Sequence, residues 1–188
     1  MRKRDILKSL KPFIDLSISV TKILPRKMRL TLFNVFQNFS GIFAIGVRYI
    51  LLKTLLKSCG NNISVHKNVV LLGLDNLEIG DNVSIHPFCY IDGAGGLVIG
   101  KDVSIAHSST ILSTEHLYSD LDIPIKDQGI KNIPTVLKDN IWIACGVRIL
   151  AGSHISNGTI IAAGAVVKGY IKPNAIYGGI PAKFLKDR

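Results

Sequence analysis

The sequence has few of the residues that mark disulfide-bonded or disordered proteins. Its 188 residues include three cysteines, one tryptophan and two methionines. Cys59, Cys89 and Cys145 are odd in number and lack a Cys-x-x-Cys spacing, which favours reduced thiols in a cytoplasmic protein. Hydrophobic residues make up 47% of the chain and charged residues 19%. This composition excludes a disordered chain and predicts one globular domain with a hydrophobic core.

Acidic residues are scarce in the first third of the chain. Residues 1–60 hold 12 of the 23 lysines and arginines but 2 of the 13 aspartates and glutamates, so they account for the whole formal net charge of +10. Residues 61–188 are neutral overall. A protein that follows a phosphate backbone needs basic residues spread over its surface. The distribution therefore argues against DNA or RNA binding.

The chain also lacks a continuous run of about 20 apolar residues, which a membrane span would need. Residues 30–47 are uncharged, but polar side chains interrupt them, and Arg48, Lys53 and Lys57 follow. A cleaved signal peptide is not expected either, because charges continue through Lys11 and no small-residue cleavage site follows a compact apolar run.

One or two amphipathic helices are therefore expected within residues 1–60. Lys53 and Lys57 share one helical face at a spacing of four residues. An apolar face is formed by Ile45, Leu52, Leu55 and Leu56. Two roles are open: a helical cap that packs on the first coil and between subunits, or a basic helix resting on anionic lipid headgroups at the inner face of a membrane. The aromatic residues expected in a cap are Phe33, Phe36, Phe39 and Phe43.

From Asn62 onward an aliphatic residue recurs at nearly every sixth position. Turn-forming residues follow many of these positions, as in Gly80-Asp81-Asn82. Neither a helical period nor simple strand alternation gives a repeat of six with regular turns. Each unit is therefore predicted to be a short strand and a turn of a β-solenoid. The series comprises Val65, Leu71, Ile79, Ile85, Ile91, Ile99, Ile105, Ile111, Leu137, Ile143, Ile149, Ile155, Ile161 and Val167.

Three such units would make one triangular coil of 18 residues. Leu71, Ile91 and Ile111 are each 20 residues apart, which is one coil plus two inserted residues. The insertions are therefore predicted to lie beside one another at one corner of the stack, where each coil rises by about 4.8 Å. Loops that cluster on a rigid scaffold are where function usually resides. The insertions are residues 72–76, 92–96 and a long loop from about 112 to 134.

Four parts of the sequence together resemble the hexapeptide-repeat acyltransferases: the sextets from Ile79 to Val167, the loop Thr114–Asp120, the stretch Asp139–Ala144 and the ending Tyr177–Lys183. The resemblance covers about two thirds of the chain. It implies a mainly-β fold, a left-handed parallel β-helix, assembled as a homotrimer with active sites between subunits and acetyl-CoA as the donor. The chain looks most like O-acetyltransferases of capsule, lipopolysaccharide and other cell-surface sugars, with maltose and galactoside acetyltransferases beside them.

Three parts of the chain are expected on this basis. Residues 1–60 form the basic helical segment, residues 61–173 form the β-helix with its extended loop at about 112–134, and residues 174–188 form a short C-terminal tail.

His116 resembles the active-site histidine of the family, since it opens the long loop two residues after Thr114. It is expected to be the general base for a sugar hydroxyl, with no metal required. Asp92, which opens the insertion one coil below, is expected to hold the second ring nitrogen of His116 or to grip the acceptor sugar. Glu115 is a rival orienting group. Further acceptor contacts are open at Asp120 and Asp122.

The last coils are expected to bind coenzyme A, because small residues there leave room for the pantetheine arm beside the backbone. The small residues are Ala144, Cys145, Ala163 and Gly164. Lys168, Lys183 and Lys186 resemble the family's cationic positions and are expected near the nucleotide phosphates. Trp142 precedes the inward Ile143, so its indole should point outward, where it lines the acceptor or pantetheine slot or packs between subunits.

Three alternatives stay open beside sugar O-acetylation. One is N-acetylation of an amino sugar on the same scaffold, another is a metal enzyme like the γ-class carbonic anhydrases, and a third is a catalytically silent trimeric scaffold. His66 and His86 are 20 residues apart and should stack on adjacent coils, but His107 is one position out of register. Structural roles are therefore expected for these three histidines and for His154.

Overall fold

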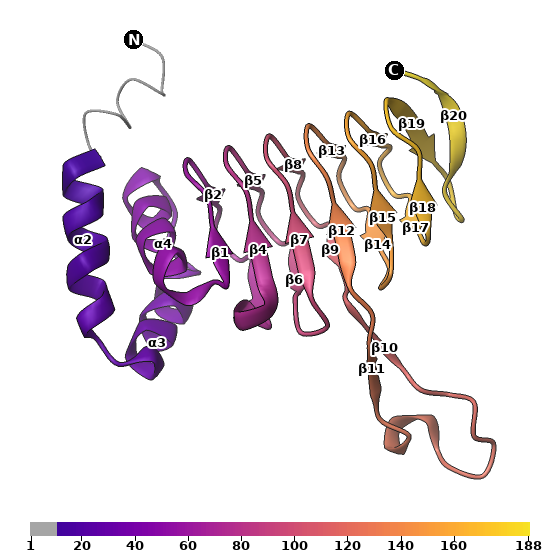
Figure 1. The fold of residues 1–188 in the computed structure, drawn as a ribbon, viewed down its shortest axis with the longest axis horizontal. Coiled ribbons are helices and arrows are strands. Elements are labelled where there is room, and N and C mark those ends of the chain that lie inside the picture. The colour runs from indigo at the N-terminus through magenta and orange to yellow at the C-terminus, as the bar shows by residue number, and fades with distance from the viewer. Residues whose placement is uncertain (1–10) are drawn as a thin grey trace.

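A helical cap and a parallel β-helix of about six turns follow one another along the chain (Figure 1). The structure, a computed structural model, describes residues 11–188. The cap contains α2 (Lys11–Ile23), α3 (Arg26–Phe36) and α4 (Ile42–Leu55). Residues 1–10 of the basic segment expected from the sequence lie outside the described residues. Within residues 11–188, no helix has the length and hydropathy needed to cross a membrane.

Three faces of short parallel strands form the β-helix. Face A consists of β1 (Ser58–Cys59), β4 (Leu77–Ile79), β7 (Leu97–Ile99), β12 (Thr135–Leu137), β15 (His154–Ile155) and β18 (Tyr170–Ile171). Face B consists of β2 (Ser64–Val65), β5 (Ser84–Ile85), β8 (Ser104–Ile105), β13 (Trp142–Ile143), β16 (Ile160–Ile161), β19 (Ala175–Gly178) and β20 (Lys183–Asp187). Face C consists of β3 (Val70–Leu72), β6 (Tyr90–Asp92), β9 (Thr110–Ile111), β14 (Arg148–Ile149) and β17 (Val166–Val167).

Two 3₁₀ turns and a hairpin interrupt the regular coils. The turns are η1 (Leu74–Asn76) and η2 (Ile125–Asp127), and the hairpin strands are β10 (Thr114–His116) and β11 (Ile130–Asn132).

The aliphatic side chains of the six-residue repeat form the core of the β-helix, as the sequence predicts. On face B, Ile85 pairs with Ile105, Ile105 with Ile143, and Ile143 with Ile161, and all four side chains are buried. On face C, Leu71, Ile91 and Ile111 stand in register, which confirms that the insertions after them share one corner. Each coil therefore buries its aliphatic side chains against those of the coils on either side.

The corner between faces A and B shows why asparagine and aspartate follow the aliphatic residues. Asn62, Asn82 and Asp102 have φ angles of 55°, 58° and 58°, a left-handed conformation that these short polar residues tolerate. Their side chains also bond along the stack. The Asn62 amide donates to Oδ1 of Asn82 at 2.9 Å, and the Asn82 amide donates to Oδ1 of Asp102 at 3.0 Å.

Arg48 joins the cap to the first coil. Its side chain is buried, and it donates to the carbonyl oxygens of Val65 at 2.7 Å, Phe36 at 2.6 Å and Phe39 at 3.0 Å. Burial lowers the pKa of the Arg48 guanidinium, while the carbonyls at and just beyond the C-terminal end of α3 attract its positive charge. One side chain thus connects α4, the end of α3 and the first strand of face B.

Apolar and charged side chains of α4 and of the residues just after it contact the first coils. Leu52 and Leu55 are buried against the first coil, as the amphipathic pattern predicts. Lys53 donates to the Cys59 carbonyl at 2.8 Å, and Lys57 pairs with Glu78 at 2.8 Å. Of the cap phenylalanines, Phe33 is buried, Phe36 is partly buried, and Phe39 and Phe43 are exposed.

Both ends of the β-helix extend beyond the limits expected from the sequence. Strand β1 pairs with β4 and begins at Ser58, three residues before the expected start at 61. At the other end β19 pairs with β16, so the chain after residue 173 continues face B rather than forming a separate tail at 174–188. Strand β20 then folds back antiparallel on β19 and covers the last edge, which protects it from pairing with other chains.

Replacing Arg48 with methionine should lower the free energy of unfolding by about 2–4 kcal/mol, because it leaves buried carbonyl groups without donors. Arg26→Met is the matched control. Arg26 pairs with Asp75 at 2.6 Å on the surface, and its loss should cost less than about 1 kcal/mol. Urea denaturation of the two variants measures the difference, and equal losses would contradict the role assigned to Arg48.

Candidate functional site

The hairpin corner is the corner between faces C and A, where residues 73–76, 93–96 and 112–134 leave the coils. The longest of these excursions projects away from the β-helix as the antiparallel pair β10 and β11 (Figure 1). Glu115 lies opposite Lys131, and His116 lies opposite Ile130. The long loop expected from the sequence is therefore present, and its base is a regular hairpin.

The two neighbouring insertions are closely packed. The Gly95 amide donates to Oγ of Ser113 at 2.9 Å, and that hydroxyl donates to the Asp92 carbonyl at 2.7 Å. A side chain at position 95 would overlap the Ser113 carbonyl, so this approach requires glycine. Ser113 is buried, and the sequence analysis did not select it. Its position two residues after the inward Ile111 is the signal that places it at this corner.

Asp92 lies at the base of the hairpin and is 7% exposed. Its Oδ2 accepts a hydrogen bond from the Thr114 hydroxyl at 2.7 Å, and its Oδ1 accepts one from the Ala94 amide at 2.9 Å. The expected hydrogen bond from the His116 ring to Asp92 is not among those of the described residues, because the short aspartate side chain reaches the nearer hydroxyl and amide. Asp92 instead fixes the residue two positions before His116.

His116 ends strand β10, and its side chain is exposed. In a strand, alternate side chains point to the same side, so Thr114 and His116 share one side of the hairpin and Glu115 points to the other. Glu115 is therefore not an orienting group for the imidazole.

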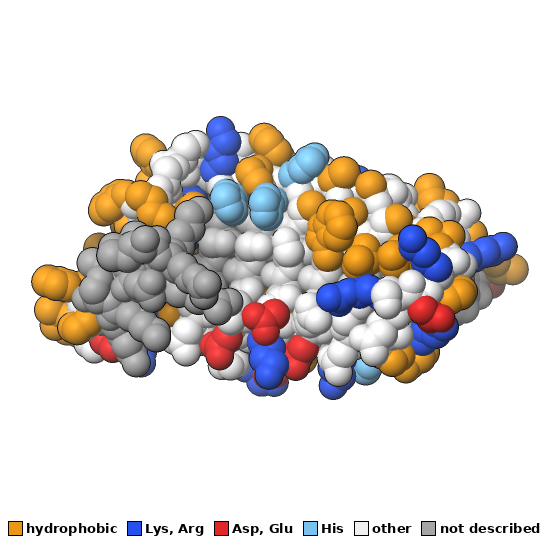
Figure 2. All heavy atoms as spheres, turned by 90° about the horizontal axis from the view of Figure 1, so that it is seen from above, with side chains coloured by type: hydrophobic (Ala, Val, Ile, Leu, Met, Phe, Trp, Pro, Cys, Tyr) orange, Lys and Arg blue, Asp and Glu red, His pale blue; other side chains and the backbone are white. Residues whose placement is uncertain are grey.

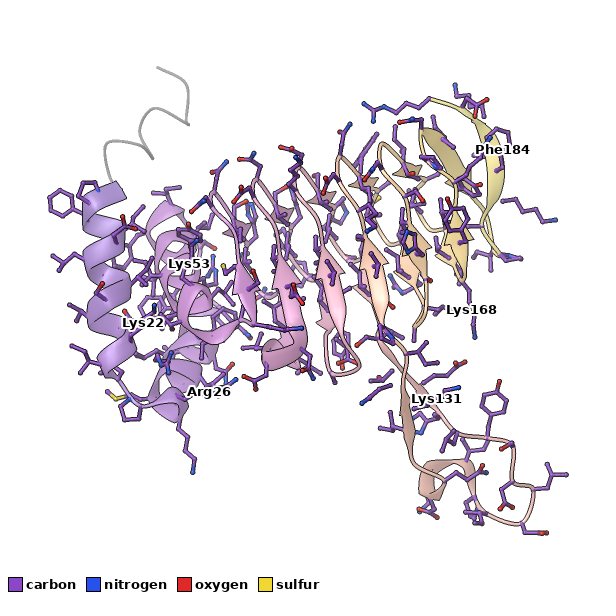
Figure 3. The ribbon with its side chains drawn as sticks, viewed as in Figure 1. Lys22, Arg26, Lys53, Lys131, Lys168 and Phe184 are labelled. Atoms are coloured by element: carbon purple, nitrogen blue, oxygen red, sulfur yellow. The ribbon has the colours of Figure 1, made fainter. Side chains whose placement is uncertain are left out.

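Lys168 contacts the hairpin from the far side of the corner. Its Nζ donates to Oε1 of Glu115 at 3.0 Å, and Figure 3 shows Lys168 near the base of the hairpin. This hydrogen bond, together with the negative charge of Glu115, raises the pKa of Lys168. The contact was not expected from the sequence, although Lys168 follows the inward Val167 as Leu112 follows Ile111, which places both at the same corner.

The residues expected to bind coenzyme A lie in three places. Ala144, Cys145 and Ala163 share the corner between faces B and C, hereafter the groove corner, where the amide of Gly164 donates to the Cys145 carbonyl at 3.0 Å. A methyl group on Gly164 would have no neighbouring atom within 4 Å, so the surface is open at this residue. Lys168 lies instead at the hairpin corner, and Lys183 begins β20.

Trp142 points outward from face B and is 52% exposed, while Ile143 beside it is buried, as strand alternation predicts. Face B is the side of the triangular coil opposite the hairpin corner. Within one chain, Trp142 and His116 therefore lie on different sides of the β-helix.

The other histidines lie apart from the hairpin. The rings of His66 and His86 stack with centroids 4.9 Å apart. Histidine side chains, in pale blue, lie close together on the face of the molecule that Figure 2 shows. Burial and the positive charges of His86 and Arg48 lower the pKa of His66. His154 stacks on Tyr170 at 5.6 Å. Among residues 11–188, no group of three or more His, Cys, Asp or Glu side chains is close enough to hold a metal ion.

No family model matches this sequence. Among curated proteins, a probable acetyltransferase of Mycobacterium tuberculosis is 38% identical over 78 residues, which is 42% of this chain and 26% of that protein. An Escherichia coli protein named for O-acetyl transfer in lipopolysaccharide biosynthesis is 32% identical over 68 residues, which is 36% of this chain and 35% of that protein. The matched segments thus span about a quarter to a third of these relatives.

Solved structures match over most of the chain. A maltose O-acetyltransferase from Clostridium difficile has a TM-score of 0.75 and 27% identity, covering 86% of this chain and 85% of that one. A galactoside acetyltransferase in complex with coenzyme A has the same TM-score and identity, covering 86% and 80%. A hexapeptide-repeat acetyltransferase from Vibrio cholerae, at 23% identity, shares the fold with a TM-score of 0.75 over 90% and 92%. Over most of its length the chain is thus similar in fold to hexapeptide-repeat acetyltransferases.

The likeness to these structures agrees with the coil stack of the chain and confirms the fold predicted from the sextets. The described coils carry two distinctive corners. The hairpin corner holds His116, Asp92 and Lys168, and the groove corner holds small residues.

Replacing Glu115 with glutamine should lower the pKa of Lys168 towards that of an ordinary lysine, because the variant removes the charged acceptor that favours the ammonium form. Asp127→Asn is the matched control, since Asp127 pairs with Lys126 at 3.1 Å elsewhere on the hairpin. NMR titration of ¹³C-labelled lysine side chains measures the pKa of Lys168 in both variants. An unchanged Lys168 titration in Glu115→Gln would contradict the contact.

Proposed function

We propose that this hexapeptide-repeat protein transfers an acetyl group from acetyl-CoA to a sugar hydroxyl in the synthesis of a cell-surface polysaccharide, with His116 as the general base. The observation that carries the proposal is the hairpin, whose strand β10 ends with the exposed imidazole of His116. Two contacts, Thr114 with Asp92 and Glu115 with Lys168, hold this strand where it leaves the coils. Similarity to maltose and galactoside acetyltransferases, and to a protein named for lipopolysaccharide biosynthesis, supports a sugar acceptor.

The chemistry needs a base because a sugar hydroxyl is a poor nucleophile near neutral pH. The imidazole of His116 accepts the hydroxyl proton while the hydroxyl oxygen bonds to the acetyl carbonyl carbon. The tetrahedral intermediate then collapses, the carbon–sulfur bond breaks, and the departing thiolate takes the proton from the imidazolium. The products are the acetyl ester and free coenzyme A, and no acyl-enzyme is formed.

Two contacts keep the base of the hairpin in place. On the side of His116, the buried Asp92 carboxylate holds the Thr114 hydroxyl at 2.7 Å. On the other side, Glu115 is bound by Lys168 at 3.0 Å. Both contacts act on the two residues immediately before the imidazole, so Asp92 and Lys168 are positioning residues in this proposal. Because the strand before His116 is held in this way, the imidazole loses less conformational freedom when the acceptor binds.

The groove corner is the proposed donor site. Ala144, Cys145 and Ala163 leave space for the pantetheine arm along the backbone, and Lys183 supplies a positive charge towards the C-terminal end. Cys145 is a small packing residue here and not a nucleophile. Lys168 is too closely associated with the hairpin corner to be assigned to the nucleotide phosphates.

A homotrimer is part of the proposal. Because the hairpin corner and face B lie on different sides of one coil, His116 meets the donor groove and the indole of Trp142 only across two copies of the chain. A three-fold assembly places each hairpin against the face of its neighbour and closes three equivalent sites.

His116→Ala should lower turnover by roughly 10²–10⁴-fold with little change in acetyl-CoA affinity, because the base acts at the reacting end of the donor. His154→Gln, on face A against Tyr170, is the control and should keep normal turnover. Thiol release from acetyl-CoA measures the rate over a panel of neutral and amino sugars. Normal turnover in His116→Ala would remove the proposed base, and a preference for amino sugars would favour N-acetylation.

Mixing two inactive variants should restore activity if the site is shared. Ala163→Trp fills the exposed groove corner and blocks the donor, whereas His116→Ala removes the base. When equal amounts are unfolded and refolded together, about a quarter of the sites in random trimers should combine an intact groove with an intact base. Differently tagged subunits verify that mixed trimers form. Mixed trimers without activity would place the whole site within one chain.

A further inference from the structure

The outermost helix of the cap carries an apolar surface that is exposed among the described residues, 11–188. Phe13, Leu16, Val20 and Ile23 follow the spacing of three, four and three residues that puts them on one side of α2, and their exposed fractions run from 55% to 82%. These four residues are called the outer stripe. Figures 1 and 3 show α2 at the end of the molecule opposite the C-terminus, lying across the axis of the β-helix, with side chains directed away from the coils.

The outer stripe is not the face that holds α2 to the protein. The helix packs against α4 through another face, where Ser17 and Thr21 line a cavity of about 190 Å³ together with Leu24 and residues of α3 and α4. Exposing a row of four large apolar side chains to water is energetically unfavourable. Contiguous apolar surfaces of this kind mark interaction sites.

The sequence suggested membrane contact through the helix that is now α4, but in the structure α2 is the better candidate. The apolar residues Leu52 and Leu55 of α4 are buried against the first coil. Lys53 of α4 donates to the Cys59 carbonyl, and Lys57, two residues after the helix, pairs with Glu78. A lipid surface would have to break these contacts to reach the face of α4 that carries Leu52 and Leu55, whereas the outer stripe of α2 is already exposed.

Charge favours an anionic partner. The sequence immediately before the stripe contains Arg2, Lys3, Arg4, Lys8 and Lys11, Lys22 lies within its range, and Lys27 follows it. Arg26 also follows the stripe, but it pairs with Asp75. The acidic residues among positions 1–27 are Asp5 and Asp15. A helix with large apolar side chains on one face and an excess of basic residues around it is typical of helices that lie in the headgroup region of anionic bilayers.

Size argues against a second copy of this chain as the partner. A helix of 13 residues is about 20 Å long and about 10 Å wide, so one of its faces covers only a fraction of the roughly 800 Å² per partner that a stable interface buries. A bilayer needs no complementary shape, because its interface accepts each apolar side chain independently.

We propose that the outer stripe of α2 docks this protein on an anionic membrane surface, with α2 in the plane of the headgroups. Since α2 crosses the end of the β-helix, the coils then stand away from the bilayer, and the hairpin corner stays in water (Figure 1). This inference does not depend on the acetyltransferase activity, and its test uses no substrate.

Co-sedimentation of the full chain with vesicles tests the proposal. Binding should require phosphatidylglycerol, be weak on phosphatidylcholine alone, and decrease as salt is raised. Leu16→Glu combined with Val20→Glu should lower the partition coefficient by roughly tenfold or more, because both substitutions bring charge to the face that enters the headgroups. Leu121→Glu combined with Ile42→Glu is the matched control, since both positions are highly exposed and lie outside α2, and it should bind as the unmodified chain does.

Light scattering on the same samples separates the membrane from a second copy. If the α2 variant changes the mass of the particle in solution while vesicle binding is unchanged, the stripe is an interface between chains and the proposal is wrong. A full chain that ignores anionic vesicles at low salt, or a control variant that loses binding as strongly as the α2 variant, would also overturn it. Circular dichroism of each variant verifies that the helices remain folded.

Discussion

The parallel stacking of coils is the constraint on which the rest of this structure depends. Each short strand satisfies its backbone groups on the strands of the coils before and after it, so a coil can neither gain nor lose residues within a strand. Extra residues fit only at the corners. This restriction explains why the inward positions are isoleucine, leucine and valine at intervals of six, and why the insertions after Leu71, Ile91 and Ile111 lie together.

The same constraint leaves two ends that must be covered. At the first coil, α4 supplies buried leucines, and Arg48 supplies donors to carbonyl groups of α3 and of β2. At the last coil, β20 pairs antiparallel with β19 and supplies the ring of Phe184, whose centroid lies 3.8 Å from Nζ of Lys172. The cap is therefore a structural requirement first, and the outer stripe of α2 is an addition to it.

The sequence predicted the regular part of this molecule better than its contacts. The repeat gave the faces, the inward Ile143, the outward Trp142 and the stack of His66 on His86, because each follows from counting along the chain. The boundaries at 61 and 174 were displaced, since strands of two residues carry little signal in sequence. The partners of Asp92 and Lys168 were also missed, because they depend on side-chain reach between coils and not on spacing alone.

The hairpin also makes one pairing between neighbouring coils more distant in sequence than the others. Most neighbouring coils bring together residues 18 or 20 positions apart, such as Ile85 and Ile105, but Ile99 meets Leu137 across 38 positions. Closing a loop of nearly twice the length costs about 0.6 kcal/mol more in chain entropy, and contacts that are distant in sequence form more slowly. The coils before and after residues 112–134 can each grow by adding neighbours, whereas the join between them must wait for the long excursion to close. The loop closure that creates the candidate site thus has the largest entropy cost among the coil pairings of the described residues.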